Sequence, residues 1–231
     1  MKLAIMQPYF LPYIGYWQLM GAVDEFIVYD NIQYIKEGWV NRILVNGEWD
    51  YVTIPLKRDS PYLNIRDRLL ARSWADERIT LLNRITAAYG KAPYFEAVLP
   101  SVKEILFYEE DNLFEFLLHS LYIIKEYLEI HTPFVISSMV DINHWLKSDK
   151  KVLAICTARG ADTYYNPIGG VNLYDKREFQ AAGIDLHFLR ARSFHYKQFD
   201  NAFVPSLSIL DVMMFNPAKR IKTYLEYYEL E

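Results

Sequence analysis

The sequence predicts an α/β protein with an open, mainly parallel sheet that is flanked by helices. Three observations indicate this fold class. The first thirty residues contain a strand, a loop, a short helix and a second strand, which together form a βαβ unit. The same alternation of short apolar runs and amphipathic segments returns after Pro133. Between them lie signals for a β-hairpin insertion at 41–56 and a helical segment at 74–128, and we expect residues 1–231 to form a single α/β domain.

The opening βαβ unit is the clearest part of this pattern. Lys2–Met6 is an apolar strand that ends at Pro8, because proline lacks the N–H that a central strand must donate. Pro12 stands where a helix can begin, and Gly21 is a typical stop. Phe26–Tyr29 is a short apolar run that predicts a second buried strand.

The middle of the chain changes character twice. Apolar residues alternate on both sides of Asn46-Gly47, which predicts an antiparallel hairpin. The polar stretch Arg58–Ser73 is expected to run over the surface. Helical periodicity then predicts one helix that ends at Gly90 and two more at Val98–Tyr108 and Leu113–Leu128.

The second half returns to the α/β rhythm. Strands are expected at Phe134–Ile136, Thr163–Tyr165 and Asp185–Leu189. Helices are expected at Lys150–Arg159, Glu178–Ala182, Ser206–Phe215 and Ala218–Leu230.

Composition excludes several classes of protein. With 52% hydrophobic and 23% charged residues the chain is a folded globular protein, and its net charge of −4 disfavours nucleic acid as a partner. The single Cys156 excludes an internal disulfide and fits the cytoplasm. No apolar run approaches the about 18 residues that a membrane span needs. No histidine pair has metal-ligand spacing, so we expect neither a metal nor a cofactor. The expected partner is a small-molecule substrate. The sequence leaves open whether the chain forms a homo-oligomer.

The densest motif follows the first strand and opens the first helix. Its candidate ligand-binding residues are Gln7, Tyr9, Tyr13, Gly15 and Tyr16. Open α/β sheets bind ligands beyond the carboxyl ends of their strands, beside helix N-termini. The alternative is a tight loop whose prolines and aromatic rings only cover the core.

A second polar segment follows the second strand, at the same edge of the expected sheet. It contains Asp30, Gln33, Lys36, Trp39, Asn41 and Arg42. Lys36 and Arg42 can hold a phosphate or a carboxylate, and Trp39 can stack on a base or a sugar. Asp30 is a candidate catalytic residue. The alternative is a solvated loop that leads into the hairpin.

Three further strand ends carry polar or small residues. Gly169-Gly170 offers backbone amides that can form an anion-binding nest, although an ordinary turn explains them equally well. His195 is the candidate acid–base, with Tyr196 as a candidate ligand-binding neighbour, against the alternative of a solvated loop histidine. Ser137-Ser138 is a weaker candidate. Cys156 lies on an apolar helix face and is expected to be buried and structural.

Two family resemblances rest on these motifs. The tetrad Tyr13-Ile14-Gly15-Tyr16 resembles the His-x-Gly-His loop of the HIGH-type nucleotidyltransferases, with phenols in place of both imidazoles. A phenol donates only a neutral hydrogen bond, so this resemblance implies the Rossmann-like, nucleotidyltransferase-like fold more than adenylyl transfer.

The segments MQPYFLPYIGYWQL, FIVYDNIQYIKEGWVNR and PSLSILDVMMFN together resemble the WbqC-like family. This resemblance implies a bacterial cytoplasmic protein of O-antigen or other surface-polysaccharide biosynthesis. The roles that it implies include transfer of an acyl or aminoacyl group to a nucleotide-linked sugar. Two alternatives stay open: a non-catalytic nucleotide- or sugar-binding scaffold with a degenerate site, and a residual nucleotidyltransferase.

Overall fold

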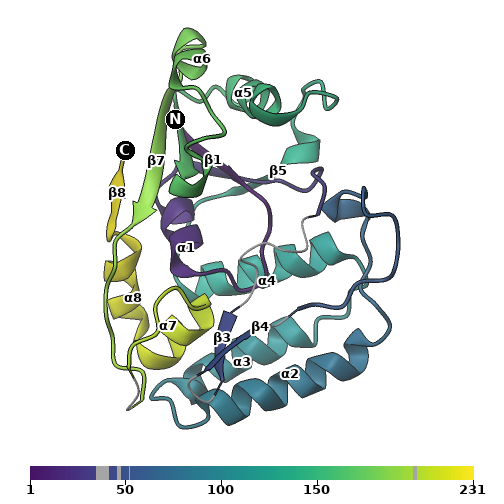
Figure 1. Ribbon diagram of the computed structural model, residues 1–231, viewed down its shortest axis with the longest axis vertical. Helices are drawn as coiled ribbons and strands as arrows, with labels where there is room; N and C mark the ends of the chain where they lie inside the picture. The colour runs from purple at the N-terminus through teal and green to yellow at the C-terminus, as the bar shows by residue number, and fades with distance from the viewer. Residues whose placement is uncertain (35–41, 46–47, 52, 200–201) are drawn as a thin grey trace.

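The computed structural model describes residues 1–34, 42–45, 48–51, 53–199 and 202–231, with only the backbone course given for 42–45 and 48–51. Its centre is a six-stranded sheet in the order β5-β2-β1-β6-β7-β8 (Figure 1). The strands are β1 (Lys2–Met6), β2 (Glu25–Val28), β5 (Phe134–Ile136), β6 (Thr163–Pro167), β7 (Asp185–Ala191) and β8 (Tyr228–Leu230). All neighbouring pairs are parallel except β7 and β8.

The strand order confirms the predicted α/β fold class. Numbered along the chain, the five parallel strands have the order 3-2-1-4-5, which is the order of a doubly wound Rossmann-like sheet. The chain builds outward from β1 through β2 to β5 and then continues on the other side of β1 with β6 and β7. In such sheets ligands bind beyond the carboxyl ends of the strands where the order reverses, and here those strands are β1 and β6.

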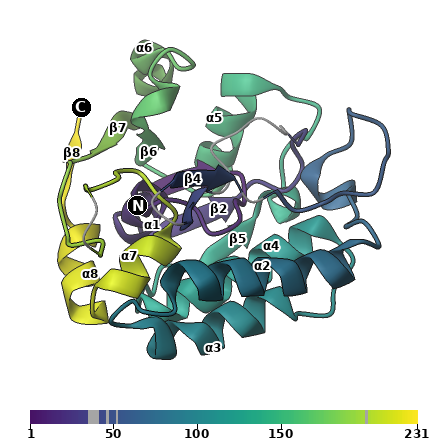
Figure 2. The same cartoon turned by 60° about the horizontal axis from the view of Figure 1, so that its bottom comes forward.

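Helices lie on both faces of the sheet (Figures 1 and 2). They are α1 (Ile14–Gly21), α2 (Trp74–Tyr89), α3 (Phe95–Leu106), α4 (Leu113–Tyr127), α5 (Ser148–Ala158), α6 (Lys176–Ala181), α7 (Ile209–Phe215) and α8 (Ala218–Leu225), with the short turns η1 (Ile65–Asp67), η2 (Ser137–Met139) and η3 (Ile168–Gly170). The side chains of β1 alternate: Ala4 joins the core shared with α1 to α4, α7 and α8, whereas Leu3 and Ile5 join the core beneath α5 and α6. The predicted hairpin is formed by β3 (Arg42–Val45) and β4 (Glu48–Tyr51).

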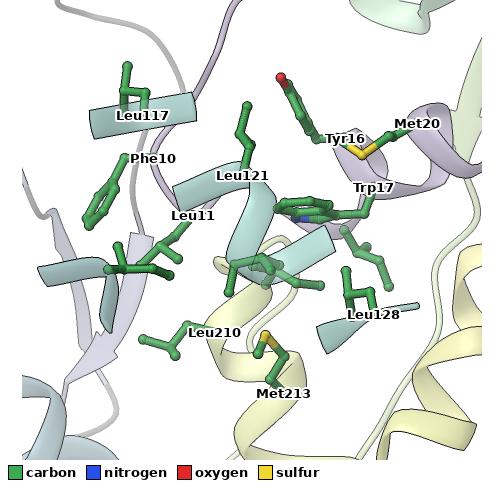
Figure 3. Packing of buried hydrophobic residues seen from close by; sticks show 14 of the residues in the cluster. Phe10, Leu11, Tyr16, Trp17, Met20, Leu117, Leu121, Leu128, Leu210 and Met213 are labelled. Atoms are coloured by element: carbon green, nitrogen blue, oxygen red, sulfur yellow. The ribbon is translucent and has the colours of Figure 1, made fainter. Parts of the chain in front are cut away.

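The larger core is built around Trp17 of α1, which is completely buried. Figure 3 shows its indole near Leu121 of α4 and Leu128, with Met213 of α7 in the same cluster. The indole N–H donates a 3.1 Å hydrogen bond to the carbonyl of Pro12, so the ring also fixes the loop between β1 and α1. Loss of such a side chain costs about 3–5 kcal/mol.

Two regions differ from the sequence-based expectation. The tail was predicted as helix through Leu230, but α8 ends at Leu225 and β8 pairs with the exposed edge of β7. Backbone pairing, with ion pairs such as Arg190–Glu231, outweighs the helical periodicity there. The stretch Arg58–Ser73 is also more than a surface excursion, because Ile65 within it is only 1% exposed. Among the described residues, no helix combines the length and the apolar character that crossing a membrane requires.

Candidate functional site

Asp30 lies immediately beyond the carboxyl end of β2 and is buried, at 2% exposure. Its carboxylate Oδ1 accepts hydrogen bonds from the hydroxyl of Ser137 at 2.7 Å and from the backbone N–H of Ser138 at 2.9 Å. Oδ2 lies 3.6 Å from the guanidinium of Arg66. Because β2 and β5 are neighbouring parallel strands, their ends meet and bring these groups together. The buried carboxylate is therefore compensated by both hydrogen bonds and an ion pair.

Asn31 connects this carboxylate to a buried lysine of α5. The ammonium of Lys151 donates to the backbone oxygen of Asn31 at 3.1 Å and to its Oδ1 at 3.0 Å. The same Oδ1 lies 2.8 Å from the Ser137 hydroxyl, and the side-chain nitrogen of Asn31 lies 3.1 Å from Nδ1 of His144. We call Asp30, Asn31, Ser137 and Lys151 the Asp30 cluster. Burial lowers the pKa of Lys151, and the charge of Asp30 opposes this effect.

Tyr29 lies beside the Asp30 cluster. The ring of Tyr29 lies 5.0 Å from the Lys151 ammonium, and burial, with smaller effects of Tyr174 and Asp30, raises the pKa of Tyr29 to about 12. Phenols in this environment stay neutral and act as hydrogen-bond donors or acceptors.

A buried amide organises the turn after β6. The hydroxyl of Tyr164 donates to Oδ1 of Asn166 at 3.1 Å, and the Asn166 amide donates to the carbonyl of Pro167 at 3.0 Å. A Cβ atom on Gly170 would lie 1.9 Å from this amide nitrogen, whereas one on Gly169 would meet no atom within 4 Å. Gly170 therefore makes room for Asn166, while Gly169 is exposed.

The loop between β1 and α1 is held by its own aromatic side chains. Tyr16 is 2% exposed, and its hydroxyl donates a 3.0 Å hydrogen bond to the carbonyl of Gln7. The ring of Tyr9 lies 5.9 Å from that of Tyr16. Tyr13 is 38% exposed, and its hydroxyl would lie 2.3 Å from a Cβ atom on Gly15. Tyr16 thus fixes the loop, and the absent side chain of Gly15 lets the ring of Tyr13 lie over the start of α1.

The N-terminus of α7 joins this loop to the predicted His195 segment. The hydroxyl of Ser208 donates to the carbonyl of Leu11 at 2.7 Å, and the N–H of Ile209 donates to that of Pro12 at 3.0 Å. Three residues after Ser208, the carboxylate of Asp211 accepts a hydrogen bond from the hydroxyl of Tyr196. The segment that begins at Pro205 therefore connects two loops that the sequence predicted to bind ligand.

Comparison with known proteins identifies the family to which these linked segments belong. A model of the WbqC-like protein family matches residues 7–223. The chain belongs to the WbqC-like family. It is also 28% identical over 232 residues to "Uncharacterized protein Rv1507c" of Mycobacterium tuberculosis (strain ATCC 25618 / H37Rv), with 98% of each chain covered. No solved structure matches the chain significantly. Membership of this family, whose name is linked to O-antigen genes, supports a biosynthetic role.

The structure separates the two predicted catalytic residues of this WbqC-like protein. His195 is exposed, with its ring 4.6 Å from that of Phe203, and it lies in the segment that packs on α7 and α8. Asp30 belongs to the cluster beside α5. In the described part of the chain no interaction links their side chains. The predicted ligand-binding residue Tyr196 is part-buried and bonded to Asp211.

The second predicted segment is only partly described. The exposed Gln33 donates to the carbonyl of Pro61 at 2.9 Å, which ties this segment to the turn before η1. Lys36, Trp39 and Asn41 lie outside the described residues. Arg42 begins β3, but its side chain also lies outside the described part. Their predicted roles in ligand binding stay predictions.

Three residues of the WbqC-like site had no predicted role: Asn31, Arg66 and Lys151. Asn31 directly follows Asp30, so its position at the strand end was a usable signal. No such signal marked Lys151 or Arg66. The lysine pair 150–151 in an amphipathic helix and an arginine in a polar stretch are both expected to be solvated. The described residues form no group of three or more His, Cys, Asp or Glu side chains that could hold a metal ion.

Proposed function

We propose that this WbqC-like protein is a transferase of bacterial surface-polysaccharide biosynthesis that acts on a nucleotide-linked sugar. One observation carries the proposal. Buried polar side chains from β2, β5 and α5 meet at the carboxyl edge of a parallel sheet with the order 3-2-1-4-5. Proteins of this architecture bind nucleotides beyond the same edge, where the strand order reverses at β1, the neighbour of β2. The family membership supports the pathway, and the polar edge supports the kind of ligand.

The predicted residues divide among the parts of such a ligand. Lys36 and Arg42 bind the diphosphate, since a guanidinium can hold two phosphate oxygens at once. Trp39 stacks on the base or the sugar. Burial raises the pKa values of Tyr9 and Tyr13, so both remain neutral and suit the hydroxyl groups of a sugar.

The reaction that fits this proposal is acyl or aminoacyl transfer to the sugar. A general base takes the proton from the sugar's hydroxyl or amine group while the oxygen or nitrogen of that group attacks the carbonyl carbon of the acyl donor. The bond between this carbon and the donor's leaving group then breaks, and the leaving group takes the proton. His195 is the proposed acid–base, because an imidazole exchanges protons near neutral pH. Asp30, the other predicted catalytic residue, lies in a separate cluster and takes no part in this proton transfer.

Calorimetric titration with UDP-glucose and dTDP-glucose tests this function. We expect binding to the unaltered protein and at least about tenfold weaker binding to the double variant Lys36→Ala, Arg42→Ala. The matched control is Lys91→Ala with Lys219→Ala, which removes two exposed cations and the same charge. Equal affinities of the two double variants would refute the assignment of Lys36 and Arg42.

A non-catalytic scaffold is the second candidate, and the tetrad favours it. Tyr13 and Tyr16 stand where the similar nucleotidyltransferase loop has two catalytic histidines. The hydroxyl of Tyr16 already donates its hydrogen bond to the carbonyl of Gln7. A scaffold binds the nucleotide-sugar and returns it unchanged. Mass spectrometry of UDP-glucose after incubation with acyl and aminoacyl donors separates the two, because only a transferase increases its mass. Magnesium-dependent release of pyrophosphate from nucleoside triphosphates would instead indicate residual nucleotidyl transfer.

A further inference from the structure

The ammonium group of Lys151 is buried among neutral partners. The residue is 5% exposed, and its two hydrogen bonds go to the two oxygens of Asn31. The ring of Tyr29 lies 5.0 Å from the ammonium, and the charge of Asp30 acts on it without forming an ion pair. In the described part of the chain no carboxylate forms an ion pair with it. A buried charge without an opposite partner costs free energy, so this placement calls for a functional reason.

The nearby carboxylates are engaged elsewhere. Asp30 accepts hydrogen bonds from Ser137 and Ser138 and faces Arg66. Asp149 lies on the same helix as Lys151, but residues two positions apart in a helix do not face each other. An ammonium has three N–H groups, and Asn31 accepts from two of them. The third N–H has no hydrogen-bond acceptor among the described residues, so it can donate to a ligand.

We propose that Lys151 binds a phosphate of the substrate's diphosphate and that Arg66 binds the neighbouring phosphate. Arg66 reaches this edge because η1 folds back on the end of β2, where the N–H of Arg66 donates to the carbonyl of Asp30 at 3.1 Å. The side chain of Arg66 is 48% exposed and has Asp30 and the exposed Asp67 as its nearby carboxylates, so a phosphate can reach its guanidinium from solvent. A lysine ammonium is a compact charge suited to a single phosphate oxygen, and an arginine can hold two.

The placement of the two cations favours a diphosphate over a single carboxylate. Lys151 contacts Asn31 and Arg66 contacts Asp30, so the cations flank two consecutive residues rather than converge on one point. Two linked phosphates present two anionic groups, one for each cation. This assignment rests on the proposed function and deepens it by naming two described residues for the diphosphate.

Isothermal titration calorimetry with UDP-glucose, UDP, uridine and inorganic pyrophosphate tests the site. Lys151→Met keeps the unbranched stem and removes the charge, so we expect it to fold, with at least about tenfold weaker binding of the three phosphate compounds and unchanged binding of uridine. The control is Lys150→Met, because Lys150 is adjacent and exposed, and we expect its affinities to stay within about twofold.

A second pair of variants does not depend on a buried position. Arg66→Ala is expected to weaken binding of UDP and pyrophosphate severalfold, while the exposed Arg72→Ala leaves it unchanged. Equal binding of UDP to the unaltered protein, Lys151→Met and Arg66→Ala overturns the site and leaves the proposed function standing. If pyrophosphate binds to the unaltered protein but not to Lys151→Met, and UDP-glucose does not bind at all, the anion site is supported and the proposed function is overturned. Absence of binding by all four compounds overturns both.

Discussion

The hydroxyl of Tyr196 donates a 2.6 Å hydrogen bond to Oδ1 of Asp211, a carboxylate with 0% exposure. The side-chain nitrogen of Gln198 lies 2.7 Å from the same oxygen, and the hydroxyl of Tyr89 donates to Oδ2 at 3.1 Å. Among the described residues no cation forms an ion pair with Asp211. Neutral donors therefore compensate this charge, and they fix the segment that carries His195 against α7.

The Tyr196→Phe substitution tests how much this bond stabilises the fold. It removes one donor from a buried carboxylate, and we expect the free energy of unfolding to fall by about 1–3 kcal/mol. Tyr62→Phe is the control, because Tyr62 is 80% exposed and should change stability by less than about 0.5 kcal/mol. Urea denaturation of both variants measures the difference. Equal midpoints would show that the hydroxyl of Tyr196 contributes nothing.

The buried position of Asp211 also predicts a dependence of stability on pH. Burial raises the pKa of Asp211 above its ordinary value, against the opposing effect of its hydrogen bonds. The folded state then binds a proton more tightly than the unfolded state does. The free energy of unfolding therefore rises as pH falls from above the raised pKa towards about 4, the pKa in the unfolded chain.

Asp211→Asn isolates this contribution, because asparagine does not titrate and the other carboxyl groups cancel in the comparison. We expect the stability of the unaltered protein relative to the variant to increase as pH falls from 7 to about 4. Urea denaturation at intervals of one pH unit measures this difference. A difference that stays constant over the range would contradict a raised pKa.

Gly170 and Gly169 offer a matched test of the turn after β6. Alanine at 170 would place its Cβ atom 1.9 Å from the Asn166 amide, which is buried and bonded to the hydroxyl of Tyr164. Displacement of this amide leaves a buried hydroxyl without its acceptor, at a cost of about 1–3 kcal/mol. Gly169→Ala meets no atom within 4 Å and should be nearly neutral. Thermal denaturation compares them, and equal melting temperatures would refute this role for Gly170.

Local patterns were sufficient to predict most of the sheet. Short apolar runs bounded by proline, glycine or asparagine identified β1, β2, β5, β6 and β7, because buried parallel strands need continuous apolar residues. The three-residue β8 was missed, since its pairing depends on the distant edge of β7 rather than on its own residues. The buried role of Ile65 was missed for the same reason: its partner Ile32 lies 33 residues earlier, and nothing in the polar stretch indicates the contact.

The candidate site shows the same division between local and distant information. Asp30 was predicted because it follows an apolar strand, and strand ends of a parallel sheet share one edge. Lys151 was not, because its burial depends on Asn31, which lies 120 residues away. Tyr16 was predicted as a ligand-binding residue from its position in the loop after β1. The sequence could not reveal that its hydroxyl donates to the carbonyl of Gln7 within the same loop.

Ser137 and Ser138 provide the most direct test of the Asp30 cluster. The hydroxyl of Ser137 is buried, lies 2.7 Å from Oδ1 of Asp30, and accepts the N–H of Asp30 at 3.2 Å. Ser138 bonds to Asp30 through its backbone N–H, which any residue but proline supplies. We therefore expect Ser137→Ala to lower the free energy of unfolding by about 1–3 kcal/mol and Ser138→Ala to change it by less than about 0.5 kcal/mol.

Chemical denaturation of the two serine variants measures this contrast. The same samples, titrated with UDP-glucose, show whether the cluster also serves binding. Because Ser137 orients both Asp30 and Asn31, and Asn31 in turn holds Lys151, its loss should weaken binding as well as stability. A Ser137→Ala protein that is less stable yet binds UDP-glucose as the unaltered protein does would limit the cluster to a structural role. Equal stability of the two variants would contradict the buried hydrogen bonds themselves.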